Sequence, residues 1–265
     1  MGSLRFRSIT ITEGESDLWI GWNRGEGTLL VEPSPAELLE EAELRRESET
    51  LLRRFRFAIQ EYGGAHPDFL TSLDPLPLDS TAAEPVPGML MSALAAGVGP
   101  MAAVAGAIAE ALGMALREHF QFDELVIENG GDYWISVKRP LPVLVYGGLS
   151  SLSGKVSVLV PPELSPCGLA CSSGTVGPSL SFGKADAALV LSPKASAADT
   201  WATALGNQLR YRSDLAPAVE ALINTVLPPL DGGPAPGYPE LYRPLGALAL
   251  MADRLAACGK IQLGS

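Results

Sequence analysis

Six short apolar segments follow one another closely in the middle of the chain, and they limit the possible fold more than any other feature. Their residues are mostly β-branched, aromatic or small, and turn residues separate them. The segments are Leu125–Glu128, Tyr133–Lys138, Val143–Tyr146, Lys155–Val160, Gly168–Cys171 and Asp186–Ser192. Most of the links between them are too short for the helical crossovers that parallel strands need. The pattern predicts mixed or antiparallel sheets with helices packed on one face, an α+β fold.

Helix signals stand before and after these strands. The alternation of apolar and polar residues from Leu4 to Trp22 predicts an N-terminal hairpin. Ser34, Pro35 and Glu37 form a complete capping box, which predicts a long helix from Pro35 to about Tyr62. Gly63-Gly64 is expected to end this helix in the left-handed conformation. The Pro- and Asp-rich stretch 65–87 has no clear period and is predicted to be a connector.

A second helix is expected from about Pro100 to Arg117, with Gly106 and Ala109 at close contacts. The surrounding stretch 89–109 carries no charge and is long enough to span a membrane, but its Ala and Gly content favours a buried helix in a protein without a membrane segment. Further helices are predicted over Ser196–Leu209, Pro217–Val226 and Glu240–Cys258. We expect one domain over residues 1–265: a hairpin and long helix (1–88), a motif-bearing core (89–210) and C-terminal helices (211–265).

Charge and cysteine content narrow the range of partners. The formal net charge is -11, and no basic stripe is present that would neutralise phosphates, which argues against nucleic acid as a partner. Three cysteines suit a reducing compartment better than a disulfide framework, and the N-terminus lacks the apolar core of a signal peptide. These features favour a cytoplasmic protein. The hairpin and the apolar composition suggest a homodimer.

Two short runs point to a binding site. Asn129, Gly130, Gly131 and Asp132 have the composition of a hairpin turn, but glycine backbone also lets a ligand approach closely while the two polar side chains contact its edge. Asp199 and Thr203 are one helical turn apart and offer two hard oxygen ligands to one divalent cation. The alternative for this pair is an acid near a helix N-terminus and a threonine bonded to backbone. Both pairs of interpretations stay open.

Four runs taken together, GPMAAVAGAIAEALG, ENGGD, SSGT and ADTWATAL, resemble the FAD:protein FMN transferases of the ApbE type. This resemblance extends from about Gly99 to Asn207. The chain is more similar still to a family of uncharacterised prokaryotic proteins distantly related to these transferases, which also matches the N-terminal and C-terminal segments. The resemblance implies an ApbE-like, T-fold-like architecture and a small, nucleotide-like ligand, FAD or FMN, bound with magnesium.

The resemblance also implies roles for particular residues. Asp199 and Thr203 would hold the magnesium ion that binds the pyrophosphate of FAD, with a main-chain carbonyl near Val104 completing the metal site. Asn129–Asp132 resembles the N-x-G-G-D motif of the transferases, shortened by one residue. Gly106 and Glu110 match the glycine and the acidic residue of their helix motif. The residues expected to bind the cofactor are therefore Asn129, Gly130, Gly131, Asp132, Ser173, Gly174, Thr175 and Glu110.

The chain departs from the transferases where a basic group is needed. Ala105 stands at the position of their lysine, and Val176–Lys184 replaces their segment of histidine and aspartate. Lys184 and Ser181 are the nearest candidates for the missing catalytic group. Three hypotheses follow: an ApbE-like protein that binds a pyrophosphate-containing nucleotide with magnesium, an enzyme that acts on another small anionic metabolite through Lys184 or Ser181, and a non-catalytic binding or assembly protein.

Overall fold

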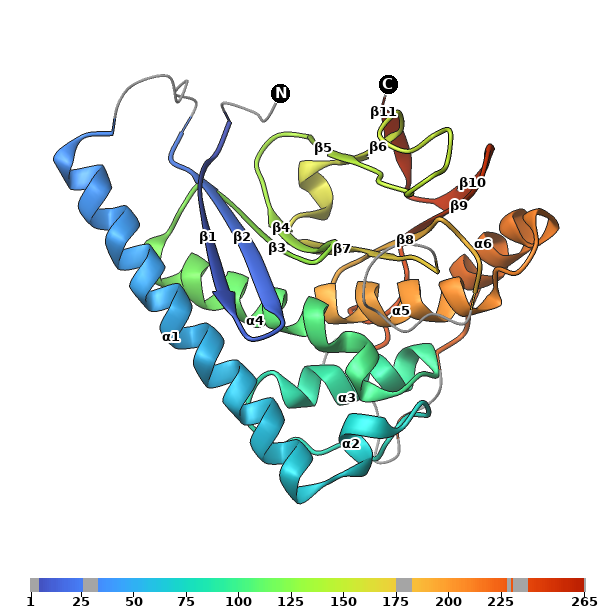
Figure 1. Cartoon of the computed structure of the whole chain (residues 1–265), viewed down its shortest axis with the longest axis horizontal. Coiled ribbons are helices and arrows are strands. Elements are labelled where there is room, and N and C mark those ends of the chain that lie inside the picture. Colours follow the sequence, from blue (N-terminus) through green and yellow to red (C-terminus); the bar gives the residue numbers. More distant parts are fainter. Residues whose placement is uncertain (1–4, 26–32, 175–182, 228–229, 231–237, 265) are drawn as a thin grey trace.

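The centre of the molecule is an antiparallel sheet. The structure is a computed structural model that describes residues 5–25, 33–174, 183–227, 230 and 238–264 (Figure 1). Within these residues eight strands are ordered β1-β2-β3-β4-β7-β8-β9-β10, and all neighbours are antiparallel. The strands are β1 (Arg7–Glu13), β2 (Ser16–Asn23), β3 (Glu124–Asn129), β4 (Asp132–Ser136), β7 (Cys167–Ser172), β8 (Ala187–Ser192), β9 (Gly246–Met251) and β10 (Arg254–Gly259). The predicted N-terminal hairpin and α+β class are confirmed.

Helices cover one face of this sheet and a small second sheet covers the other (Figure 1). The helices are α1 (Pro35–Ala65), α2 (Asp68–Thr71), α3 (Val86–Ala96), α4 (Val104–Phe120), α5 (Ala195–Gln208) and α6 (Leu215–Ile223), with 3₁₀ turns at Pro100–Ala103, Pro162–Leu164 and Arg212–Asp214. The small sheet has the order β11-β6-β5 and consists of β5 (Leu141–Leu144), β6 (Ser157–Val160) and β11 (Gln262–Gly264). Each of the six segments predicted in the middle of the chain forms a strand.

The long helix α1 begins as predicted and ends later. Both hydrogen bonds of the capping box between Ser34 and Glu37 are present. The helix continues through Gly63 and Gly64 to Ala65, so the predicted end at these glycines is wrong. Gly63 packs against α2 instead: a Cβ atom there would lie 2.6 Å from the Leu70 side chain, which would have to shift.

The small-residue helix α4 is buried between the sheet and its neighbouring helices, as predicted. Ala109 is completely buried, and a Cβ atom on Gly106 would lie 2.3 Å from the carbonyl oxygen of Ala195 at the start of α5. Among the described residues, Pro100–Phe120 is the one helical segment long and apolar enough to cross a membrane, and 56% of its most apolar window is buried inside the protein. The small residues therefore serve the close approach of α4 and α5.

Three predictions at the edges of the fold are wrong. The predicted helix Glu240–Cys258 is the hairpin of β9 and β10, whose turn places Ala252 at φ 55°. The alanines of β9 face the helices and its leucines face the small sheet, so burial on both faces overrides the helical preference of Ala and Leu. The helix α3 was not expected, and the stretch 65–87 contains the short helix α2.

Candidate ligand and metal site

The site lies where α4 and α5 cross. Gly106 of α4 contacts Ala195 of α5, and the Asp199 carboxylate accepts a hydrogen bond from the Gly106 amide at 2.9 Å. No side chain at the N-cap position of α4 satisfies the free amides of its first turn. Asp199 does so from the neighbouring helix, and the N-terminal end of the helix dipole favours its negative charge.

The predicted glycine turn connects β3 and β4 and brings two polar side chains to this crossing. Asn129 pairs with Asp132, so Gly130 and Gly131 form a two-residue loop, with φ of 64° and 102°. The amide of Asn129 donates to the carbonyl oxygen of Ala105 at 3.1 Å. Oδ1 of Asp132 accepts a hydrogen bond from the Cys171 amide at 3.3 Å. The run is a hairpin turn, and of its four residues Asp132 lines the cavity described below, whereas Asn129, Gly130 and Gly131 do not.

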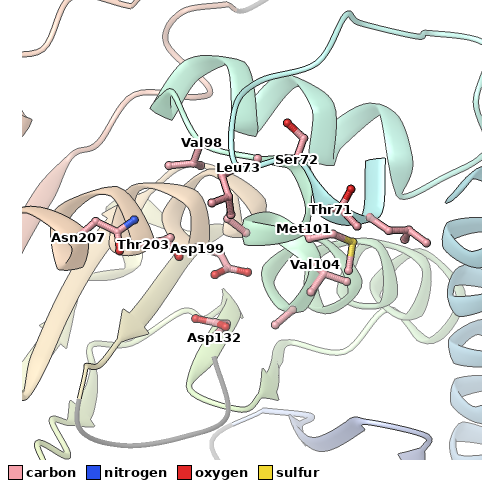
Figure 2. A pocket seen from close by; sticks show the side chains of 14 residues that line it. Thr71, Ser72, Leu73, Val98, Met101, Val104, Asp132, Asp199, Thr203 and Asn207 are labelled. Atoms are coloured by element: carbon pink, nitrogen blue, oxygen red, sulfur yellow. The ribbon is translucent and has the colours of Figure 1, made fainter. Parts of the chain in front are cut away.

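A cavity of about 400 Å³ opens between these elements, within the usual size range of small-molecule pockets. Figure 2 shows the carboxylates of Asp132 and Asp199 facing each other, with Thr203 beside Asp199 on α5. The lining residues are Leu70, Thr71, Ser72, Leu73, Val98, Gly99, Met101, Ala102, Val104, Ala105, Asp132, Asp199, Thr203 and Asn207. The structure therefore places Asp199, Thr203, Val104 and Asp132 on the wall of one cavity. That they bind a ligand or a metal ion stays a prediction.

Electrostatics set the two carboxylates apart from ordinary surface acids. Burial raises the pKa of both, and the charge of Asp199 raises the pKa of Asp132 further. The amides of Gly106 and Ala105 lower the pKa of Asp199 in part. Two acids that repel each other in a partly dry cavity are stabilised when a cation binds between them.

The oxygen atoms fit a hard divalent cation better than a soft one. The Thr203 hydroxyl has no hydrogen-bond partner in the described part of the chain, unlike Thr200 on the same helix, which donates to the carbonyl oxygen of Ala197 at 3.0 Å. No three His, Cys, Asp or Glu side chains cluster as a metal site within the described residues. A cation here would have two carboxylates, a hydroxyl, main-chain oxygen and water as ligands, which is the donor set that Mg²⁺ accepts.

Glu110, predicted to bind the cofactor, lies outside this cavity. Its carboxylate accepts hydrogen bonds from Lys194 at 2.6 Å and from the amide and hydroxyl of Ser196 at 3.2 and 3.1 Å. It caps the first turn of α5 and lines a separate cavity with Lys194 and Ser196. Glu110 thus fixes the position of the helix that carries Asp199.

The remaining predicted residues divide into two groups. Ser173 and Gly174 follow β7, and Gly174 donates its amide to the carbonyl oxygen of Ala185, but neither lines the cavity. Lys184 is exposed, donates its amide to the carbonyl oxygen of Leu209 at 2.7 Å, and also lies outside the cavity lining. Thr175 and Ser181 lie outside the described residues.

Sequence reasoning missed two parts of the lining. Asn207 continues the spacing of Asp199 and Thr203 by another four residues, so the same helical periodicity would have found it. Thr71, Ser72 and Leu73 form a wall from the end of α2, within the stretch predicted to be a connector (Figure 2). Gly99 permits this contact, because a Cβ atom there would lie 1.8 Å from the carbonyl oxygen of Ser72.

The fold matches that of a flavin transferase. The structure of the Pseudomonas stutzeri flavinyl transferase ApbE in its apo form aligns with a TM-score of 0.50 and 11% identity, over 97% of this chain and 95% of that chain. At this identity the likeness shows a shared fold only. The class of protein defined by the fold is therefore ApbE-like.

Sequence comparison identifies the family. A family model described as AbpE bacteria matches residues 3–223. A UPF0280 protein of Methanocaldococcus jannaschii is 33% identical over 218 residues, which are 82% of each chain. A UPF0280 protein of Methanosphaerula palustris is 46% identical over 154 residues, and the match spans 57% of this chain and 63% of that relative. The chain belongs to the AbpE bacteria family, which is distantly related to the ApbE flavin transferases.

Proposed function

We propose that this protein binds a pyrophosphate-containing nucleotide together with Mg²⁺, with FAD as the first candidate. The observation that carries the proposal is the convergence of Asp132, Asp199 and Thr203 in one cavity at the start of α4, where the Thr203 hydroxyl has no hydrogen-bond partner among the described residues. A pyrophosphate group has the charge that a magnesium ion on two carboxylates would bind. The flavinyl transferase with the same fold supports a flavin as the nucleotide.

The metal would be held by this chain's own oxygen atoms. Asp199 is already fixed by the Gly106 amide, and Asp132 is fixed by the Cys171 amide, so both carboxylates are oriented before any ion binds. Magnesium would neutralise the phosphate charge there. We propose that the protein binds this ligand in the cytoplasm and as a homodimer. We propose no reaction, because no histidine or lysine of the described residues lines the cavity.

A thermal-shift panel tests the proposal. The full chain is heated with FAD, FMN, ATP or NAD, each with and without Mg²⁺. A ligand that binds the folded state raises the melting temperature by mass action, so FAD with Mg²⁺ is expected to give a larger shift than FAD with EDTA. Equal melting temperatures across all nucleotides, with or without the metal, would contradict the proposal.

A further inference from the structure

A second cavity adjoins the first along the helix α4. It has a volume of about 320 Å³ and lies between the turn of β1 and β2, the C-terminal half of α1 and the first turns of α4. Four residues line both cavities: Leu70, Met101, Val104 and Ala105. Leu70 is 45% exposed although it is apolar, so the border between the cavities is open to solvent. A ligand that reaches across this border would cover it.

The second cavity combines apolar walls with a polar end. Ile59 of α1 and Ile108 of α4 are buried side chains on its walls. Arg56 and Gln60 stand one turn apart on α1 and form the polar end together with Glu15 and Ser16. Apolar walls with a few polar groups are usual in small-molecule binding sites, and a flat heteroaromatic ring offers both an apolar face and a polar edge to such a site.

Arg56 is held in place and its charge is already balanced. Its guanidinium donates to the Ser16 hydroxyl at 2.8 Å and forms an ion pair with Glu15. A phosphate would have to compete with Glu15 for this arginine, so the second cavity is poorly suited to a second anionic group. Ring nitrogen and carbonyl groups need no net charge to bind there.

We propose that the second cavity holds the heteroaromatic ring of the bound nucleotide, and that Arg56 and Gln60 select the ring by hydrogen bonds to its edge. The inference rests on the proposed function, since it assumes that the pyrophosphate lies at Asp132 and Asp199. Asn129 lines the second cavity, and its side-chain amide donates to the carbonyl oxygen of Ala105, a residue that lines both cavities. Selection would then come from α1, outside the part of the chain whose sequence motifs resemble those of the transferases.

Calorimetry with the full chain separates this inference from the proposed function. The probes are FAD and inorganic pyrophosphate, each with Mg²⁺, because pyrophosphate has no ring. Arg56→Ala and Gln60→Ala are each expected to weaken FAD binding about tenfold, the value of one hydrogen bond to a ligand, and to leave pyrophosphate binding unchanged. Arg46→Ala, an exposed position on the same helix, is the matched control.

The outcomes have distinct meanings. Gln60→Ala guards against a folding defect, because the Gln60 side chain has no hydrogen bond within the described residues. Unchanged FAD affinity in both variants would overturn the ring site while the proposed function stands. If the unmodified protein binds neither FAD nor pyrophosphate in the presence of Mg²⁺, the proposed function itself is overturned. Titration with FMN and with ADP then identifies the ring, because only the one that occupies this cavity loses affinity in the variants.

Discussion

The Asp199 carboxylate caps the first turn of α4 through the Gly106 amide, at 2.9 Å. One residue of α5 thereby links the two helices and also faces the cavity across from Asp132 (Figure 2). The backbone and the candidate metal site depend on the same side chain. We therefore expect substitutions at the contact between α4 and α5 to change the free energy of unfolding.

Substitution of Gly106 by leucine should overpack the crossing. A Cβ atom at this position already meets the main chain of Ala195 at 2.3 Å, and backbone cannot move away as a flexible side chain can. We expect Gly106→Leu to lower the free energy of unfolding by about 1–3 kcal/mol, measured by urea denaturation. Gly88→Ala in α3, where a Cβ atom would meet no atom within 4 Å, is the control and should be neutral or slightly stabilising. Equal stability of the Leu variant and the wild type would contradict the close contact of α4 and α5 at Gly106.

Glu110 is predicted to act as a structural cap for α5. Glu110→Gln breaks the ion pair with Lys194, whose side chain is 26% exposed, and should cost about 1–3 kcal/mol of stability. Because Glu110 lies outside the cavity, the affinity of the folded variant for FAD should stay within about threefold of wild type. Calorimetry below the melting temperature checks this. A large loss of affinity without a loss of stability would place Glu110 at the ligand instead.

Low pH should weaken the ion pair between Arg5 and Glu124, the first residue of β3. Burial alone would raise the pKa of Glu124, but hydrogen bonds from Arg5 and the Lys138 amide lower it to about 2. A carboxylate with a lowered folded-state pKa stabilises the protein above its ordinary pKa of 4.5, and this contribution is lost as the pH falls from 4.5 towards 2. The shift corresponds to about 3 kcal/mol.

Comparison with Glu124→Gln isolates this group from the other acids. Urea denaturation should show the wild type to be more stable than Glu124→Gln at pH 7, with the difference shrinking between pH 4.5 and 2.5. The side chain of Glu124 is only 3% exposed, so solvent screens the ion pair with Arg5 weakly. A difference that stays constant over this pH range would show that the carboxylate has an ordinary pKa in the folded protein.

Flavin transfer to a threonine is predicted to be absent. Transfer needs a base beside the acceptor hydroxyl, but no lysine or histidine of the described residues lines the cavity, and Lys184 lies outside its lining. Incubation with FAD, Mg²⁺ and a threonine-containing acceptor peptide should give no FMN-peptide by mass spectrometry. Robust transfer that disappears in Lys184→Ala would contradict this prediction and make Lys184 a replacement base.

The features of the fold that could be predicted are those determined by residues close together in the sequence. The capping box at Ser34 and the short links between strands depend on neighbouring residues, so they could be predicted. The hairpin of β9 and β10 could not, because Ala and Leu prefer a helix until two layers bury both of their faces. Gly63 was misassigned for a similar reason: Leu70, which packs against it, lies on another element.

Only the site residues that recur every four positions along α5 could be grouped from the sequence pattern. Asp199 and Thr203 share a face by spacing alone, and the same spacing extends to Asn207. The facing of Asp132 and Asp199 depends on how β4 packs below α5, which no local pattern encodes. The wall from Thr71 to Leu73 likewise follows from the contact of α2 with Gly99.

The most direct test of the central claim is the magnesium dependence of FAD binding in Asp199→Asn. Asparagine keeps the shape and the contact to the Gly106 amide but removes the charge that a hard cation needs. Calorimetry should show that Mg²⁺ strengthens FAD binding in the wild type and in the exposed control Asp253→Asn, and has no effect in Asp199→Asn. An equal magnesium effect in Asp199→Asn and the wild type would contradict a metal site at Asp132 and Asp199.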